Sequence, residues 1–291
     1  MPILNRLRRS APMRILLEAV AVIASVAISS RLLSLAVPSE AGVLHSSLAM
    51  VRNLLVAGLA LGVYALMVRW LERRRATELM LRPGAAHFLA GGALGIALMA
   101  TVYGILWAAQ MAVFGSGDGL THLADGLVAM FLAAVFEELL FRAVLFRILE
   151  QACGTSVALV GSALLFGFAH GLNPGATLIS DVAIVIEAGL LLGLAYALTR
   201  NLWLAIGIHT GWNFTEGSVF GVSVSGTPAT SSLFHSMLKG PDLLTGGAFG
   251  PEASIIAIAV CGLAALVLGV QVYRRGGWRP AAFRLRLDDG S

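Results

Sequence analysis

Residues 126–147 read GLVAMFLAAVFEELLFRAVLFR, an apolar run that contains two adjacent glutamates and an arginine near its middle. A transmembrane helix needs roughly 20 mostly apolar residues, and this stretch is long enough. An Asp, Lys or Arg at the centre of such a helix costs about 2.5–3.5 kcal/mol on insertion scales, so ionisable residues there usually mark function. We therefore take this stretch as the centre of a polar site inside a membrane helix bundle.

The composition of the whole chain agrees with membrane insertion. Of its 291 residues, 58% are hydrophobic and 12% are charged, against roughly 25% charged in ordinary soluble domains. The mean hydropathy is +0.85. This composition argues against a soluble globular protein, a disordered chain or a disulfide scaffold. The two cysteines, Cys153 and Cys261, form neither a disulfide framework nor a CxxC metal motif.

The predicted fold class is all-α: a polytopic membrane helix bundle with about eight transmembrane helices and a polar intramembrane cavity. Proline and glycine punctuate the apolar runs, and Gly189 and Gly193 form a GxxxG pattern that permits close helix approach. The candidate spans lie near 15–37, 51–70, 87–114, 126–147, 155–172, 176–198, 202–222 and 253–273.

The basic residues predict the orientation of these spans. An eight-span arrangement places 16 of the 20 Lys and Arg residues on one side, and only Arg31, Arg52 and Lys239 on the other. Cytoplasmic loops carry the excess of Lys and Arg, so both termini are predicted to be cytoplasmic. The sequence thus predicts an integral membrane protein, taken to be in a bacterial cytoplasmic membrane. Its basic charge reflects topology rather than nucleic-acid binding, and its oligomeric state stays open.

We divide the chain into four regions. Residues 1–123 form an N-terminal membrane region of three spans, and 124–222 form a core of four spans. Residues 223–252 form an extracytoplasmic loop rich in Gly, Ser, Thr and Pro, in which 233–238 are expected to form a short interfacial turn. Residues 253–291 comprise the last span and a basic cytoplasmic tail.

Within 126–147, the spacing of the charged residues separates two roles. Glu138 and Arg142 are four residues apart, so they share a helix face and can form an ion pair. Glu137 is rotated about 100° from Glu138 and has no basic partner in its own helix. Such a carboxylate can hold or accept a proton near neutral pH. An alternative is that all three residues form one structural salt-bridged cluster.

Two histidines in other spans complete the candidate site. His170 ends the fifth span, and His209 has Asn213 one turn later on its own face. An asparagine amide suits either an oxyanion hole or the orientation of a histidine. His170 can meet Glu137 only if its helix starts later, tilts, or continues past Gly171.

Four more acidic residues occur within the predicted spans. Helix packing is the favoured interpretation for Glu18, Asp181 and Glu187. Glu216 lies three residues after Asn213 on the same side of its span and could hydrogen-bond to that site.

The order EExxxR (Glu137, Glu138, Arg142), FxxxH (Phe166, His170) and HxxxN (His209, Asn213) resembles the three-motif signature of the CPBP intramembrane proteases. That family joins the type II CAAX prenyl endopeptidases to bacteriocin-processing and lysostaphin-resistance-protein-A-like proteins. The resemblance covers roughly residues 124–220, and it makes 124–222 a catalytic CPBP-like core.

The resemblance implies a membrane-embedded endopeptidase that acts on a membrane-associated peptide or protein, by CAAX-type or leader-peptide processing. Carried over to this sequence, Glu137 with His170 activates a water molecule. His209 and Asn213 stabilise the oxyanion, and Glu138 with Arg142 holds the geometry. The partners are this substrate and the lipid bilayer.

Members of the family are often labelled metalloproteases, but this sequence has no HExxH motif. Glu137, His170 and His209 could supply three zinc ligands, with a fourth position left for water. We favour a metal-free, glutamate-dependent mechanism, and zinc is the alternative cofactor. The alternative functions are a proton-coupled transporter and a non-catalytic membrane scaffold of the same fold.

Overall fold

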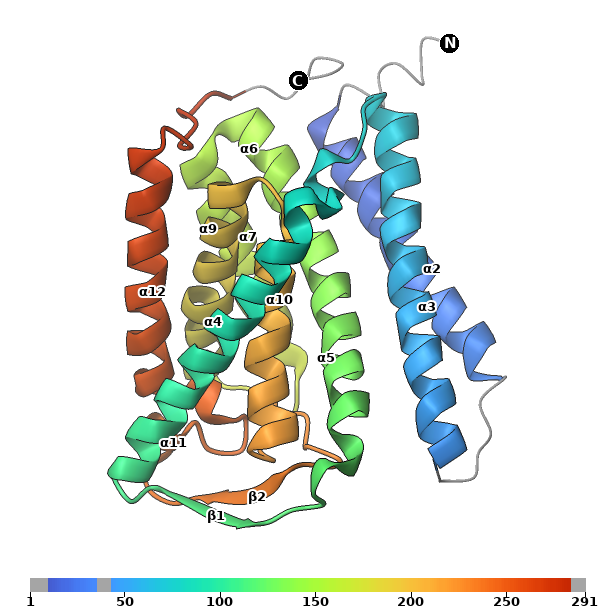
Figure 1. Ribbon diagram of the computed structural model, residues 1–291. Helices are drawn as coiled ribbons and strands as arrows, with labels where there is room; N and C mark the ends of the chain where they lie inside the picture. The colour runs from blue at the N-terminus through green and yellow to red at the C-terminus, as the bar shows by residue number, and fades with distance from the viewer. Residues whose placement is uncertain (1–9, 36–42, 284–291) are drawn as a thin grey trace.

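The computed structural model describes residues 10–35 and 43–283. It is a bundle of roughly parallel helices, with a two-stranded sheet at the end opposite to the chain termini (Figure 1). The helices begin with α2 (Ala11–Ser34), α3 (Val43–Met67) and α4 (Leu81–Ala108). The π-helical turn η1 (Val68–Glu72) continues α3, and the 3-10 turn η2 (Thr77–Leu79) precedes α4.

The central helices are continued by short π-helical or 3-10 segments. They are, in chain order, η3 (Leu120–His122), α5 (Leu123–Glu138), η4 (Leu139–Phe146), α6 (Arg147–Cys153), α7 (Thr155–Ala169), η5 (His170–Leu172), α8 (Leu178–Ile184), η6 (Val185–Leu190), α9 (Leu191–Thr199), α10 (Leu202–Asn213) and η7 (Phe214–Val219). The chain then forms α11 (Asp242–Thr245), η8 (Pro251–Ala253) and α12 (Ile255–Arg274).

The predicted fold class is confirmed. Among the described residues, six helices are long and apolar enough to cross a membrane: 11–34, 46–72, 81–108, 155–172, 178–199 and 255–274. The other two predicted spans correspond to the helical segments 123–153 and 202–219, which run alongside these six (Figure 1). Both segments carry residues of the candidate site: Glu137, Glu138 and Arg142 in the first, and His209 and Asn213 in the second.

Glycines allow α4 and α10 to cross closely at the centre of the bundle. A Cβ atom added at Gly95 would lie 2.1 Å from the Ile208 carbonyl oxygen, and one at Gly207 would lie 2.3 Å from that of Phe88. The predicted contact of Gly189 is also present, because a Cβ there would lie 2.8 Å from Ala163 Cα. Small residues thus set the helix spacing around the helix that carries His209.

The structure corrects three predicted segments. The third span was expected to reach residue 114, but α4 ends at Ala108 and β1 follows at Ala112–Ser116. The expected interfacial turn at 233–238 is strand β2 (Phe234–Leu238), which pairs antiparallel with β1. The seventh helix ends at Val219 rather than at residue 222. The paired residues are 118 to 126 positions apart, and helical periodicity does not reveal such a non-local contact.

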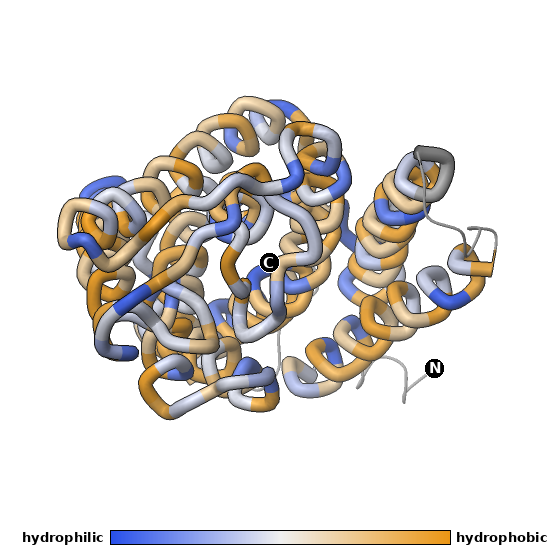
Figure 2. The backbone as a smooth tube through the Cα atoms, turned by 90° about the horizontal axis from the view of Figure 1, so that it is seen from below, coloured by the Kyte–Doolittle hydropathy of each residue, from blue (hydrophilic) through white to orange (hydrophobic). Residues whose placement is uncertain are grey.

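Helices α2 and α3 form a hairpin set to one side of the other helices (Figure 2). Near the termini this hairpin is held to the bundle by buried ion pairs. Arg147 of α6 contacts Glu18 of α2 at 3.1 Å and Glu72 of η1 at 2.6 Å. Glu18 thus has the helix-packing position predicted for it.

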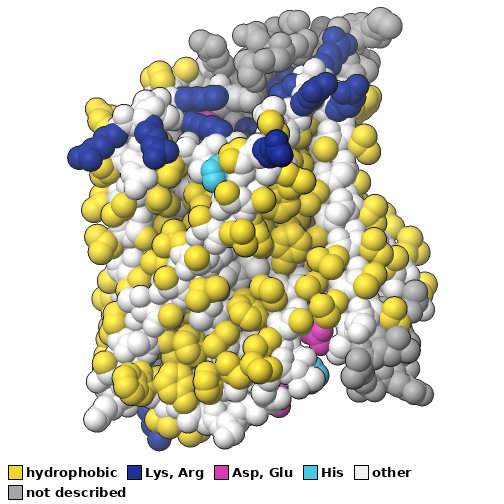
Figure 3. All heavy atoms as spheres, viewed as in Figure 1, with side chains coloured by type: hydrophobic (Ala, Val, Ile, Leu, Met, Phe, Trp, Pro, Cys, Tyr) yellow, Lys and Arg dark blue, Asp and Glu magenta, His cyan; other side chains and the backbone are white. Residues whose placement is uncertain are grey.

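The basic side chains gather at the end of the bundle that carries the termini (Figure 3). The described residues of this group come from the turn between α3 and α4, from the ends of α9 and α12, and from α2 and α6. They are Arg14, Arg69, Arg73, Arg74, Arg75, Arg82, Arg147, Arg200, Arg274, Arg275 and Arg279. The remaining members of the predicted cluster lie outside the described residues.

Candidate active site

Three elements bring Glu137, His170 and His209 together in the middle of the bundle. The Glu137 carboxylate, near the end of α5, has its Oε2 atom 3.8 Å from Nε2 of His170 and 3.8 Å from Nε2 of His209. Its side chain is 25% exposed, whereas the two imidazoles are 13% and 8% exposed. The carboxylate is therefore within one water-bridged reach of both imidazoles, as the proposed chemistry requires.

The second ring nitrogen of each histidine has a fixed partner. His170 Nδ1 lies 2.8 Å from the carbonyl oxygen of Phe166, one turn earlier in α7. His209 Nδ1 lies 2.9 Å from Glu138 Oε1. Both partners are acceptors, so we assign a proton to each Nδ1 and turn each Nε2 towards Glu137. The two histidines thus present their Nε2 atoms to one shared space.

Glu138 links this site to the surrounding helices. Arg142 Nη1 donates to Glu138 Oε1 at 2.9 Å, so the ion pair expected from the four-residue spacing is present. Arg142 also donates to the Ala188 carbonyl oxygen at 2.6 Å and lies 4.4 Å from the Phe166 ring centroid. Glu138 and Arg142 are buried, and their contacts reach η6, α7 and α10, so they fix the position of His209.

His170 lies at a change of helix type. Helix α7 ends at Ala169, and the 3-10 turn η5 carries the chain through Gly171 to Leu172. Continuation past Gly171 was one of the conditions set for His170 to reach Glu137. The π-helical segments η4 and η7 likewise begin directly after Glu138 and Asn213. Such π-bulges occur frequently at functional sites.

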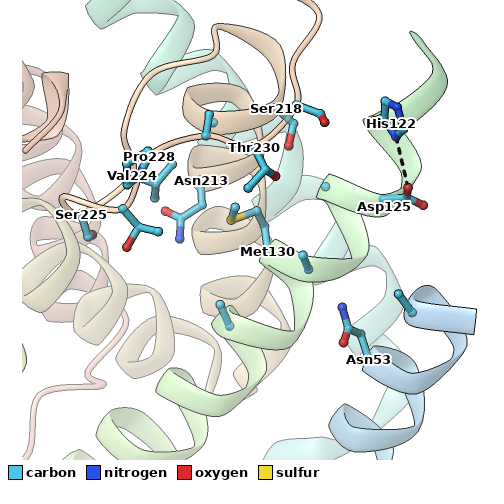
Figure 4. A pocket seen from close by; sticks show the side chains of 18 of the residues that line it. Asn53, His122, Asp125, Met130, Asn213, Ser218, Val224, Ser225, Pro228 and Thr230 are labelled. Atoms are coloured by element: carbon cyan, nitrogen blue, oxygen red, sulfur yellow. Dashed lines mark ion pairs between the residues drawn. The ribbon is translucent and has the colours of Figure 1, made fainter. Parts of the chain in front are cut away.

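A cavity of about 540 Å³ opens from the site towards the sheet end of the bundle. Glu137, His170, His209 and Asn213 line its inner end. The rest of its wall comes from α3, the first half of α5 and the loop 224–231. Figure 4 shows the Asn213 amide on this wall, together with Met130 of α5 and with Val224 and Pro228 of the loop. The polar intramembrane cavity expected from the sequence is thus present.

A second group of carboxylates lies behind the two histidines. A small cavity of about 30 Å³ is lined by His170, His209, Glu187 and Glu252, among others. Glu216 Oε1 accepts a hydrogen bond from the backbone N–H of Glu252 at 3.4 Å. Burial raises the pKa of Glu252. The hydrogen bond from the Ser225 backbone N–H acts in the opposite direction but is the smaller effect.

Glu252 was not among the residues that the sequence singled out. It lies in the short 3-10 turn η8 just before α12, and a single acidic residue there gives no signal of burial in the sequence. The sequence has a glycine nearby, Gly250, and in the structure this residue has a φ of 127°, in the left-handed region of an ordered turn.

The donor set was tested for zinc. In four-coordinate zinc, bonds of about 2.0–2.1 Å place neighbouring ligand atoms roughly 3.4 Å apart. Both Glu137–histidine contacts are longer, at 3.8 Å. Within the described ranges, no group of three or more His, Cys, Asp or Glu side chains is arranged to hold a metal ion. These observations do not support the metalloprotease label, and the zinc alternative stays a prediction.

The fold and the site define a polytopic membrane protein with a buried Glu–His–His–Asn cluster open to a polar cavity. Residues 119–215 match the family described as type II CAAX prenyl endopeptidase Rce1-like, which confirms the resemblance inferred from the three motifs. The match spans 97 of the 291 residues, and all six predicted site residues lie within it. No curated protein and no solved structure matches the chain. The similarity therefore covers the helices that carry the candidate site, from α5 to the start of η7.

Proposed function

We propose that the protein is an intramembrane endopeptidase in which Glu137 activates water for attack on a peptide bond. The observation that carries this proposal is the placement of one carboxylate oxygen 3.8 Å from two imidazole nitrogens, at the inner end of a cavity. With its Nδ1–H bonded to an acceptor, a neutral His170 presents an acceptor Nε2 to the same space as the Glu137 carboxylate, and a protonated His209 turns an N–H towards it. A water molecule, which donates two hydrogen bonds, suits that space.

In the first step, Glu137 and His170 orient the water, and Glu137 takes one of its protons as the oxygen attacks the carbonyl carbon. A doubly protonated His209 donates Nδ1–H to Glu138 and Nε2–H to the developing oxyanion. The Asn213 side chain, one turn away on α10, supplies a second donor. Fixed donors aimed at a developing charge in a water-poor site are usually the largest single contribution to catalysis.

In the second step, the tetrahedral intermediate collapses, and the bond between carbon and nitrogen breaks. The proton held by Glu137 passes to the leaving amine, so each peptide bond cleaved consumes one water molecule. Glu138 and Arg142 do not touch the reacting atoms in this scheme. They act as positioning residues, because their ion pair holds the imidazole of His209. No metal ion takes part in this scheme.

We further propose that both termini lie in the cytoplasm. The basic side chains gather at the end of the bundle that carries the termini (Figure 3). Cytoplasmic loops carry an excess of Lys and Arg, so this distribution supports the orientation.

The test is cleavage of a membrane-tethered reporter by the purified full-length protein in proteoliposomes. General acid–base catalysis contributes about 10²–10⁴-fold, so Glu137→Gln should lower kcat by that factor. The matched control is Asp242→Asn, which makes the same carboxylate-to-amide change on the exposed helix α11 and should leave kcat unchanged. Full cleavage by Glu137→Gln would refute the role of Glu137. Absence of cleavage by the unmodified protein, with proton-coupled flux lost in the same variant, would favour a transporter.

A further inference from the structure

The cavity opens at the end of the bundle that lacks the arginine cluster. Its outer wall includes His122 and Asp125, at the start of α5, and the loop 224–231. Thr230 and Ser218, which are labelled with His122 and Asp125 in Figure 4, line the same cavity. This is the sheet end in Figure 1, opposite to both termini. With both termini in the cytoplasm, as proposed above, the mouth of the cavity is extracytoplasmic.

The lining of the cavity has an unusual charge composition. None of its 24 lining residues is Arg or Lys, and its acidic residues are Asp125 and Glu137. The other polar groups are mainly hydroxyls and amides, with histidines at three positions. Arg52, which neighbours the lining residue Asn53 on α3, donates to the Asn53 side-chain oxygen at 3.0 Å. The wall therefore offers a bound peptide hydrogen bonds and negative charge, without a lysine or arginine as counter-ion.

This lining disfavours the C-terminal type of substrate that the CAAX label suggests. A CAAX sequence ends three residues after its cysteine, so cleavage after that cysteine brings a free α-carboxylate close to the catalytic centre. The cationic imidazole of His209 is already bonded to Glu138 and is used for the oxyanion. A carboxylate moved into this cavity thus finds no lysine or arginine partner and pays a large desolvation cost, and the charges of Asp125 and Glu137 add repulsion. An internal segment of a longer chain carries no α-carboxylate at this position.

We infer that the substrate is an internal, uncharged or basic segment of a membrane-anchored polypeptide, presented from the extracytoplasmic side. This inference rests on the proposed endopeptidase function and on the proposed orientation. It differs from them in assigning the side of the membrane and the charge of the peptide that the cavity accepts.

The side of the membrane is tested by labelling single cysteines in intact cells. In a background of Cys153→Ser and Cys261→Ala, the matched variants are Thr230→Cys at the cavity mouth and Thr77→Cys at the arginine end. Both threonines are exposed. A membrane-impermeant maleimide should label Thr230→Cys in intact cells, and Thr77→Cys only after permeabilisation. The reverse pattern would overturn the inference and leave the endopeptidase proposal standing.

The charge preference is tested in proteoliposomes with three reporters of the same core sequence. The first continues well past the scissile bond, the second ends three residues after it with a free carboxylate, and the third ends there with an amide. The first should be cleaved at least about tenfold faster than the second, because an unpaired buried charge costs several kcal/mol. The third should recover most of this difference.

A second reporter cleaved as fast as the first would overturn the inference, and so would an amide that brings no recovery. If the unmodified protein cleaves none of the three, the endopeptidase proposal fails and this inference with it, whatever the labelling shows. A gain-of-function variant adds an independent check. Thr230→Arg places a cation at the exposed mouth, so it should increase cleavage of the carboxylate reporter relative to the amide reporter.

Discussion

Near the termini, the buried carboxylates of Glu18, Glu72 and Glu78 all contact arginine, whereas those of Glu187 and Glu216 contact none in the described part of the chain. Arg147 alone reaches all three of the first group, and Arg74 contacts Glu72 and Glu78 at 2.8 Å each. Near the histidines, both oxygens of Glu187 and one of Glu216 have no hydrogen-bond partner in the same described part.

Buried carboxylates thus have two different roles at the two ends of the bundle. An arginine that contacts a buried carboxylate favours its ionised form and ties the helices together. A carboxylate surrounded by histidines and other carboxylates keeps the ability to exchange a proton. Removal of a charge should therefore cost stability at the terminal end and activity at the cavity end.

The largest effect on stability is expected from Arg147→Met. Removing this guanidinium leaves the carboxylates of Glu18 and Glu72 buried with reduced compensation. Breaking a buried ion pair in this way typically costs 3–5 kcal/mol, so the free energy of unfolding in mixed micelles should fall by about that amount. The control is Arg275→Met, at the exposed end of α12, which should leave the unfolding curve unchanged. An unchanged curve for Arg147→Met would remove the distinction between the two ends.

The next effect concerns the oxyanion donor. Loss of one such donor lowers kcat by about 10²–10³-fold in well-studied hydrolases, and we expect a loss of that size for Asn213→Ala, with normal stability. Asn53→Ala is the matched control, because Asn53 lines the same cavity from α3. It should change KM more than kcat. Equal losses of kcat in both variants would show that Asn213 has no special role.

The same substitution should have opposite effects on stability at the two ends. Glu187→Met removes buried oxygens that lack partners, and leaving such a group unsatisfied costs about 1–3 kcal/mol, so the variant should be more stable by that order. Glu72→Met removes the partner of Arg74 and Arg147 and should be less stable. Unfolding curves in mixed micelles compare the two directly. Destabilisation by both would mean that Glu187 has a structural role.

The site residues could be predicted because local spacing determines their relationships. Glu138 and Arg142 meet at a separation of four residues in a helix, and the three motifs occur in order along the chain. The Glu138–His209 contact joins residues 71 positions apart, and helix packing rather than spacing creates it. The π-helical turns and Glu252 also escaped prediction, since no local residue pattern specified them. The division of the chain into four regions stays a prediction.

The smallest effect is a difference in pH dependence between two acids outside the spans. Burial favours the neutral form of Glu78, but the hydrogen bond from Arg74 and the charges of Arg147 and Arg74 outweigh it and lower the pKa of Glu78. Glu78 therefore contributes stability that is present above the unfolded pKa, near 4.5, and is lost as the pH falls through its lower folded pKa. For Glu252, burial raises the pKa, so its contribution is present below pH 4.5 and is lost as the pH rises through the folded value.

In the Glu78→Gln variant, the free energy of unfolding should therefore fall less as the pH drops below 4.5. In the Glu252→Gln variant, it should fall less as the pH rises above 4.5. Unfolding free energies measured from pH 3 to pH 8 for the unmodified protein and both variants test the two signs together. The comparison is internally controlled, because each variant makes the same carboxylate-to-amide change and should leave the other variant's pH range unaffected. If both variants changed the same pH range in the same direction, the two ends would not differ in how they hold their carboxylates. Opposite signs would show that arginine contacts, rather than burial alone, decide which acids of this bundle stay ionised.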